Sequence, residues 1–184
     1  MTFGAPQLII VGLGNLPMPL TRHSVGQLVV DALASRLGIH LSSNRRGISG
    51  QGSVLLAGRP VALTLFKSKK LMNISGPSIV EAYRATVSSP SSMIVISDSL
   101  SHKPQTLSAR LGGSANGHNG LKSIMSALGG ETGFWQFRAG IGRDESDAAD
   151  YVLRKLSSSE RSFWENEGLD KVLKEIEKVA SQQK

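Results

Sequence analysis

The 184-residue chain is long enough for one well-buried core and short for two. Because it contains no cysteine, disulfides, thiol nucleophiles and cysteine-ligated metals are excluded. No apolar run approaches the roughly 18 residues that a membrane span needs, and the first residues resemble neither an export signal nor an organelle presequence. We therefore expect a single domain over residues 1–184 in the cytosol, with no membrane association.

The net charge of +7 is unevenly distributed along the chain. Residues 1–143 carry +10, whereas residues 144–184 carry −3. A basic body favours a polyanionic partner, because neutralising phosphates releases counterions. Many soluble proteins are basic for other reasons, so charge alone leaves nucleic acid as one option among several.

A short apolar run at residues 7–11 predicts a buried strand, and Gly12–Asn15 predicts a tight turn after it. Gly12 and Gly14 also open a dinucleotide-binding fingerprint, but its third glycine would fall on Pro17. The acidic residue that this motif needs in a second strand is also missing. A Rossmann cofactor site is therefore the weaker interpretation.

A helix is predicted from about Ser24 to Leu37. Ser24 with Gln27 three residues later is a capping-box pattern, and Gly38 suits the residue just past the helix end. His23 then lies at the helix N-terminus, where the positive end of the dipole disfavours a second positive charge. We expect a neutral imidazole near pH 7 that accepts a proton; a capping or packing role is the alternative.

Residues 42–52 are polar and glycine-rich, and they predict a loop. Residues 52–57 and 60–66 then flank a turn, as the strands of a hairpin do. A run of lysines follows, together with Asn73, and leads into a helix that begins near Ser75. A solvated charge run is the ordinary interpretation of the lysines.

Residues 92–96 predict a third buried strand, whose carboxyl end delivers Asp98. Ligands of open α/β sheets gather at the carboxyl ends of strands, so Asp98 is a functional candidate; an Asx-turn carboxylate explains it equally well. Residues 105–111 predict an edge or antiparallel strand.

The glycine-rich residues 112–122 predict a backbone that turns sharply or lies close against another surface. Asn119 is expected to cap a helix over residues 120–128. Residues 133–142 then predict a strand that contains Arg138. Ser157 and Glu160 form a second capping box that opens a terminal helix over about residues 158–180, in which Gly168 is a candidate break.

In a parallel wound sheet the strand-to-helix junctions lie along one edge, so the polar side chains at these junctions would converge with Asp98. A His–Asp pair activates a nucleophile, and water is the simplest one here because no Gly-x-Ser-x-Gly elbow is present. We expect no metal, because no His-x-His or His-Glu-x-x-His spacing occurs. The converging side chains are Asn15, His23, Asn73, His118 and Asn119.

Several segments closely resemble, in order, the signature segments of the bacterial-type peptidyl-tRNA hydrolase family. They span residues 8–153, and the Gly117–Lys122 segment is quite specific. The resemblance implies a monomeric α/β hydrolase that cleaves the ester between a peptide and the 3′ end of tRNA, with no metal or cofactor. It also implies a three-layer sandwich, in which a mixed, mostly parallel twisted sheet has helices on both faces. The matching segments are residues 10–15, 21–23, 72–76, 112–123 and 137–143.

By resemblance, His23 would activate water, Asp98 would hold it in its basic form, and Asn15 would distinguish N-blocked from free aminoacyl groups. Asn73 and Asn119 would bind the tRNA 3′ end and the peptide backbone. The remaining implied contacts are the substrate-binding residues Met18, Leu71, Met72 and His118 and the 5′-phosphate clamp Arg110 and Arg138.

The chain also departs from the family pattern. The segment Asn15–Thr21 is shorter than usual and places Met18 where a Tyr is usual, and Leu71 replaces a usual Phe. Residues 97–102 keep Asp98 but lose the acids normally around it. A tRNA- or RNA-binding module without turnover is the main alternative, and a nucleotide-cofactor enzyme is a distant one. A cytosolic and a mitochondrial tRNA pool both stay open.

Overall fold

A computed structural model describes residues 4–183, so the expectations about the first three residues and the last one lie outside this range. The fold is one seven-stranded sheet in the order β2-β3-β4-β1-β5-β7-β6. The strands are β1 (Gln7–Gly12), β2 (Ser42–Ser43), β3 (Gly47–Leu56), β4 (Arg59–Ser68), β5 (Met93–Ser99), β6 (Leu107–Leu111) and β7 (Trp135–Gly140). The α-helices are α1 (Val25–Leu37), α2 (Gly76–Thr86), α3 (Asn119–Ala127), α4 (Ala148–Val152), α5 (Ser158–Glu165) and α6 (Glu167–Ser181), and the short 3-10 turns are η1 (Arg22–Ser24), η2 (Met72–Ile74) and η3 (Pro90–Ser92).

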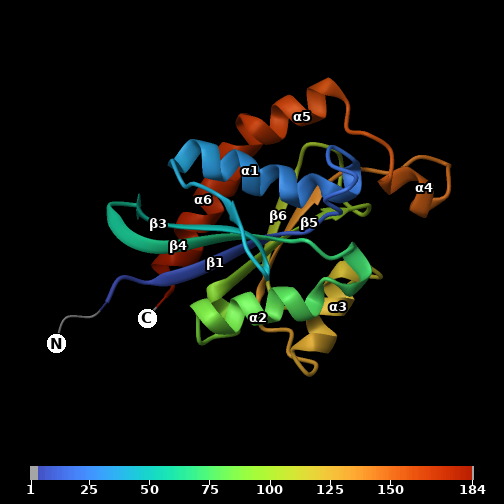
Figure 1. The fold of residues 1–184 in the computed structure, drawn as a ribbon. Coiled ribbons are helices and arrows are strands. Elements are labelled where there is room, and N and C mark those ends of the chain that lie inside the picture. The colour runs from blue at the N-terminus through green and yellow to red at the C-terminus, as the bar shows by residue number, and fades with distance from the viewer. Residues whose placement is uncertain (1–3, 184) are drawn as a thin grey trace.

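The sheet is mixed but parallel at its centre. Strands β4, β1, β5 and β7 run parallel, while β3 and β6 pair antiparallel on either side of them. Helices α1, α5 and α6 cover one face of the sheet, and α2 and α3 cover the other (Figure 1). The predicted three-layer α/β sandwich and the antiparallel strand near residues 105–111 are therefore confirmed.

Alternate side chains of the central strands enter two separate cores. In β1, Leu8 and Ile10 pack into the core beneath α1, α5 and α6, whereas Ile9 and Val11 pack into the core beneath α2 and α3. This alternation follows from the two-residue repeat of a strand, and burial on both faces explains why β1 reads as a continuous apolar run.

The prediction of a loop over residues 42–52 is wrong, because this segment forms β2 and most of β3. Its glycines allow close backbone approach. A Cβ atom at Gly50 would lie 2.2 Å from the His40 carbonyl oxygen, and one at Gly47 would lie 2.4 Å from that of Lys67. The glycines of this segment are typical of a loop in composition, but here they let β3 pack closely against the neighbouring backbone.

The predicted terminal helix is two helices. The capping box of Ser157 and Glu160 begins α5 as expected. The helix is interrupted at Asn166, two residues before Gly168, and α6 then begins at Glu167.

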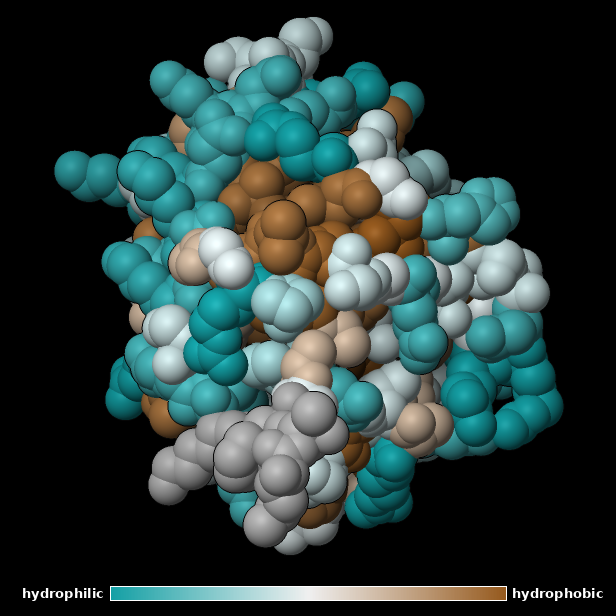
Figure 2. Space-filling view, turned by 90° about the vertical axis from the view of Figure 1, so that its left-hand side faces the viewer, coloured by the Kyte–Doolittle hydropathy of each residue, from teal (hydrophilic) through white to brown (hydrophobic). Residues whose placement is uncertain are grey.

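Within residues 4–183, no helix has the length and apolar character that crossing a bilayer requires. Figure 2 shows the side of the molecule away from α4, where apolar surface is exposed within a polar surround.

Gly26 sets how closely α1 approaches the strands. A Cβ atom there would lie 2.2 Å from the Ile96 carbonyl oxygen and 2.7 Å from the Leu13 nitrogen. Both atoms belong to backbone, which cannot move aside as a flexible side chain can. The start of α1, and with it the turn η1 that carries His23, is therefore pressed against the carboxyl ends of β1 and β5.

We predict that Gly26→Ala lowers the free energy of unfolding by about 3 kcal/mol, because the added methyl group overlaps the backbone of Leu13, just after β1, and of Ile96 in β5. Urea unfolding measures the loss. Gly4→Ala is the matched control, since a Cβ atom at Gly4 would have no neighbour within 4 Å. Equal stability of the two variants would contradict this close approach.

Candidate active site

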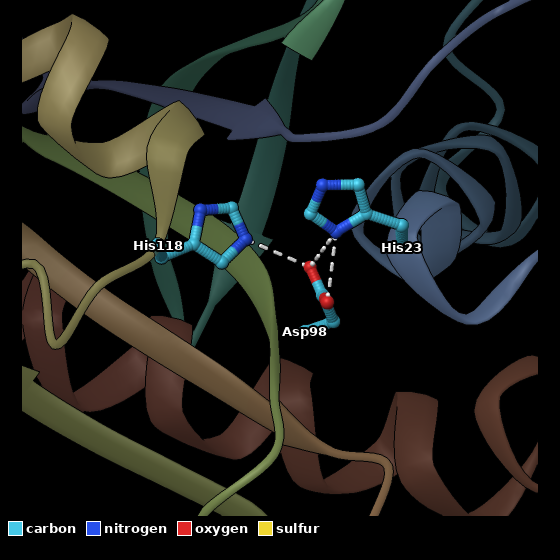
Figure 3. A group of neighbouring side chains, drawn as sticks. All are labelled: His23, Asp98 and His118. Carbon is cyan, nitrogen blue, oxygen red and sulfur yellow. Dashed lines mark hydrogen bonds and ion pairs between the residues drawn. The ribbon is translucent and has the colours of Figure 1, made fainter. Parts of the chain in front are cut away.

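The Asp98 carboxylate lies between two imidazoles at the end of β5 (Figure 3). His23 Nδ1 lies 2.9 Å from Asp98 Oδ2 and 3.1 Å from Oδ1, and His118 Nε2 lies 2.8 Å from Oδ1. The Asp98 side chain is only 3% exposed, against 16% for His23 and 11% for His118. The predicted contact between residues 23 and 98 is therefore present in the structure.

These contacts determine which nitrogen of His23 carries a proton in its neutral form. An ionised carboxylate only accepts hydrogen bonds, so His23 Nδ1 must donate to Asp98. The other nitrogen, Nε2, then holds a lone pair. His23 therefore presents a proton acceptor on the side of the ring away from Asp98.

His118 is held in the opposite tautomer. Its Nδ1 accepts hydrogen bonds from the backbone N–H groups of Gly120 (3.1 Å) and Leu121 (3.3 Å), so Nε2 carries the proton donated to Asp98. His118 is thus the N-cap of α3, and the prediction that Asn119 caps this helix is wrong. The imidazole nitrogen supplies the acceptor that an Asn or Asp oxygen usually supplies.

The route by which His118 reaches Asp98 differs from the predicted one. Strand β6 is antiparallel to β7, and Leu111 pairs with Trp135 at the amino end of β7, opposite the site. The chain then returns over the sheet through residues 112–118. Gln136 donates to the carbonyls of Gly113 and Ser114 at 3.3 and 3.1 Å and so fixes this return. The expected convergence of parallel junctions therefore does not account for His118.

Gln136 was not identified from the sequence, although it is fully buried. Its Oε1 accepts from Nε and Nη2 of Arg138 at 3.1 and 2.8 Å, and Arg138 Nη2 also donates to the Ser114 carbonyl. A polar residue within the otherwise apolar residues 134–137 was the available signal. Gln136 and Arg138 together connect β7 to the loop that carries His118.

The carboxyl group of Asp98 has a pKa below its ordinary value. Burial acts to raise this pKa, but the hydrogen bonds from His118 and His23 favour the ionised form and outweigh burial. The charge on Asp98 is thus stabilised by hydrogen bonds from His118 and His23, which lie on opposite sides of the carboxylate.

Asn15 lies in the segment that connects β1 to η1, the turn that carries His23. Its backbone N–H donates to Ser24 Oγ at 3.0 Å, and Ser24 Oγ donates to the Met18 carbonyl at 2.9 Å. Ser24 therefore organises the turn, and the predicted side-chain cap from Ser24 to α1 is not formed. The side-chain Oδ1 of Asn15 accepts from the Met72 N–H at 2.7 Å, which leaves the Asn15 amide NH2 as a donor at the cavity.

These groups line one open cavity of about 720 Å³. Arg110 is absent from its lining and lies exposed on β6. The burial of Arg138 lowers the pKa of its own guanidinium group, and the nearby charge of Arg110 lowers this pKa further. Residues of α4 and the following Leu153 form part of the wall and were not identified from the sequence. The predicted site residues in the lining are Asn15, Met18, His23, Leu71, Met72, Asn73, Asp98, His118, Asn119 and Arg138.

The exposed apolar side chains gather at this cavity. In the part of the chain that the structure describes, six large hydrophobic residues are exposed, and four of them line the cavity. Because apolar surface is costly to leave in water, such a concentration marks a binding site. The four are Met18, Leu71, Ile74 and Leu153, with Leu55 and Leu111 elsewhere.

The arrangement of His23, Asp98 and His118 also has the spacing of a metal site, since their candidate ligand atoms lie within 4.8 Å of one another. The donor set does not fit a metal. His118 Nε2 could bind one only in the tautomer with a proton on Nδ1, which would face the N–H groups of Gly120 and Leu121. The three side chains are instead arranged as donors to one carboxylate.

A mixed α/β sheet that presents a buried carboxylate, an oriented imidazole and an amide donor in an open cavity has the groups that an α/β hydrolytic enzyme needs to activate water. The family model for peptidyl-tRNA hydrolase matches residues 9–184. The chain belongs to this family.

The relatives agree with this assignment. The chain is 40% identical over 162 residues to a peptidyl-tRNA hydrolase of Mycobacterium sp. (strain KMS), covering 85% of this chain and 82% of that protein. It is 41% identical over 157 residues to one of Geobacter metallireducens, covering 83% and 78%. The crystal structure of peptidyl-tRNA hydrolase from Acinetobacter baumannii is similar, with a TM-score of 0.83 and 29% identity over 98% of this chain and 92% of that one.

We predict that the Asp98 carboxyl carbon, followed by NMR, titrates with a midpoint below pH 3.8, the ordinary pKa of such a group. Because the pKa is lowered in the folded state, the stabilisation from ionised Asp98 is complete above about pH 4 and is lost as the pH falls through the lowered pKa. The stability difference between the wild type and Asp98→Asn should therefore shrink below about pH 4. Titration at or above pH 3.8 would mean that burial dominates.

Proposed function

We propose that this chain hydrolyses the ester bond between the peptide and the tRNA 3′ end of peptidyl-tRNA, using water activated by His23. One observation carries the mechanism: His23 Nδ1 donates to the buried Asp98 carboxylate, so Nε2 is a proton acceptor at an open cavity. Membership of the peptidyl-tRNA hydrolase family supports the substrate.

In this mechanism, the water oxygen attacks the ester carbonyl carbon while His23 Nε2 takes its proton. Asp98 remains ionised and stabilises the imidazolium through Nδ1. The tetrahedral intermediate collapses as the bond from carbon to the ribose oxygen breaks, and Nε2 returns the proton to that oxygen. The products are a peptide with a free carboxyl group and tRNA with a free 3′-terminal hydroxyl group.

Asn15 provides a physical basis for preferring blocked aminoacyl groups. Its Oδ1 is occupied by the Met72 N–H, so the amide faces the cavity as a donor only. An acylated amino group brings a carbonyl oxygen that accepts from this NH2. A free ammonium group brings only donors, which would meet the Asn15 donor unpaired.

Asn73 on η2 and Asn119 at the start of α3 are both exposed and line the cavity, where η2 and α3 contact each other. Amide side chains offer both a donor and an acceptor, which suits a peptide backbone and ribose hydroxyls. We assign both to the peptide and the tRNA 3′ end. Met18, Leu71 and Met72 supply the apolar contact surface next to them.

Arg138 is suited to an anion. It is only 8% exposed, it donates to neutral groups of Gln136 and Ser114, and among residues 4–183 it takes part in no ion pair. A buried cation without an opposite charge is costly, and a phosphate would repay that cost. We assign Arg138, with the exposed Arg110, to the 5′ phosphate of the tRNA.

The substrate also suggests where the protein works. Because tRNA is aminoacylated and used where translation occurs, we assign this chain to the cytoplasm, with a mitochondrial tRNA pool as the alternative. We expect it to act as a single-domain monomer without a cofactor. The strongly basic residues 1–143 would face the tRNA.

The direct test compares N-acetyl-aminoacyl-tRNA with free aminoacyl-tRNA as substrates. We predict that the wild type hydrolyses the blocked substrate and that His23→Ala reduces kcat by about 100- to 10,000-fold, the usual contribution of a positioned general base. Binding of the tRNA without turnover by the wild type would favour an RNA-binding module and overturn the proposal.

The phosphate role is tested with Arg110→Ala, which removes an exposed cation that does not itself line the cavity. We predict weaker tRNA affinity and a salt dependence shallower by about one phosphate contact, with unchanged cleavage of a small ester lacking tRNA. Arg59→Ala removes the same charge at the amino end of β4 and is the control. Equal losses for both variants, or on both substrates, would contradict a phosphate contact.

A further inference from the structure

We propose that Arg22 and Glu160 form a positioning pair that holds the turn carrying His23 in its reactive orientation. The inference rests on the proposed function of His23 and adds a role for the C-terminal part of the chain. Arg22 precedes His23 in η1, and Glu160 lies in the first turn of α5. Arg22 Nη2 donates to Glu160 Oε1 at 3.0 Å.

The turn η1 has little support of its own. It contains three residues, and the residue before it, Thr21, makes no side-chain cap to it. A single 3-10 turn has few internal hydrogen bonds. Its orientation must therefore be set by contacts with other segments, and Ser24 supplies these only on the side of Asn15.

On the other side, the chain from residue 20 to residue 22 lies along residues 154–156. The Arg22 N–H donates to the Arg154 carbonyl at 2.9 Å, and the Leu156 N–H donates to the Leu20 carbonyl at 2.8 Å. Thr21 and Lys155 form an antiparallel bridge. These backbone contacts join residues that are more than 130 positions apart in the chain, directly before His23.

The Arg22 side chain fastens this junction. Its Nη1 donates to the Lys155 carbonyl at 2.9 Å, and its guanidinium carbon lies 4.8 Å from the centre of the Tyr151 ring. Tyr151 is itself fixed, because its hydroxyl donates to the Ile141 carbonyl at 2.5 Å. A carbonyl, a carboxylate and an aromatic ring thus hold one planar guanidinium, which leaves it little freedom to rotate.

Glu160 serves two structures at once. Its Oε1 accepts from Arg22 and also from the Ser157 N–H at 3.1 Å, as the capping box of α5 requires. The Arg22 and Glu160 side chains are 16% and 10% exposed, so the pair is largely removed from solvent. The start of α5 and the turn of His23 are therefore fixed by the same carboxylate oxygen.

Loss of Glu160 would leave the Arg22 side chain held only by the Lys155 carbonyl and the Tyr151 ring, and the loosened turn would let the His23 ring depart from its hydrogen bond to Asp98. A misplacement of about 1 Å in a reacting group lowers rates by about 100-fold. The effect should appear in kcat and not in KM, because Arg22 and Glu160 are absent from the cavity lining.

The test uses full-length Glu160→Ala and, as its control, Ser157→Ala. Both remove one half of the α5 capping box, but only Glu160→Ala removes the partner of Arg22. With N-acetyl-aminoacyl-tRNA, Glu160→Ala is expected to lower kcat by about 10- to 100-fold with KM within about twofold. Ser157→Ala should lose similar stability in urea and keep wild-type kcat.

Two further readouts separate positioning from general stability. Glu160→Gln keeps an Oε1 acceptor for both Arg22 and the cap, so it should recover most of the lost kcat. The hydrogen bond to Asp98 should protect the His23 Nδ1 proton, so its NMR signal is expected in the wild type and in Ser157→Ala and should be lost by exchange in Glu160→Ala.

Equal kcat losses in Glu160→Ala and Ser157→Ala, or a Glu160→Ala enzyme with wild-type kcat, would overturn the positioning role. Both outcomes presuppose an active wild type. If the wild type hydrolyses no peptidyl-tRNA substrate, the proposed function itself fails, and the NMR comparison of the His23 proton still decides whether Glu160 positions this ring.

Discussion

The site depends on one buried carboxylate that accepts hydrogen bonds from two imidazoles. Asp98 accepts one hydrogen bond from His23 Nδ1 on one side and another from His118 Nε2 on the other. These bonds lower its pKa despite burial and keep it an acceptor. Because each histidine donates to the same carboxylate, the other nitrogen of His23 is left as an acceptor for the proposed reaction, while that of His118 caps α3.

The two imidazoles are delivered by different layers of the sandwich. His118 comes from the side of α3, on a loop that Gln136 and Arg138 bind to β7. His23 comes from the side of α1, on a turn joined to residues 154–160. Asp98 lies between these layers, near the carboxyl end of the inner strand β5. Of these two supports, only the contact of Arg22 with Glu160 involves no residue of the cavity lining, because Arg138 lines the cavity.

The cavity combines surfaces of different chemistry, as a substrate that is part peptide and part nucleic acid requires. Exposed apolar side chains gather at its rim, amides project from η2 and α3, and Arg138 carries a charge that its neighbours do not neutralise. The orientation of the Asn15 amide follows from a backbone contact with Met72. Selectivity for a blocked amino group would then come from the absence of an acceptor, and not from the shape of the cavity.

The sequence by itself determined the α/β class, the central strands, the cap of α5 and the candidate pair His23 and Asp98, because apolar periodicity, capping residues and local motifs are encoded over a few neighbouring positions. It misjudged residues 42–52, where glycines serve close packing, and it named Asn119 where His118 is the cap. Only the tertiary structure decided the tautomers of the two histidines, the return of residues 112–118 over the sheet and the contact of Arg22 with Glu160. Each of these depends on hydrogen bonds between groups that are distant in the chain, and no local pattern specifies which distant donor will meet which acceptor.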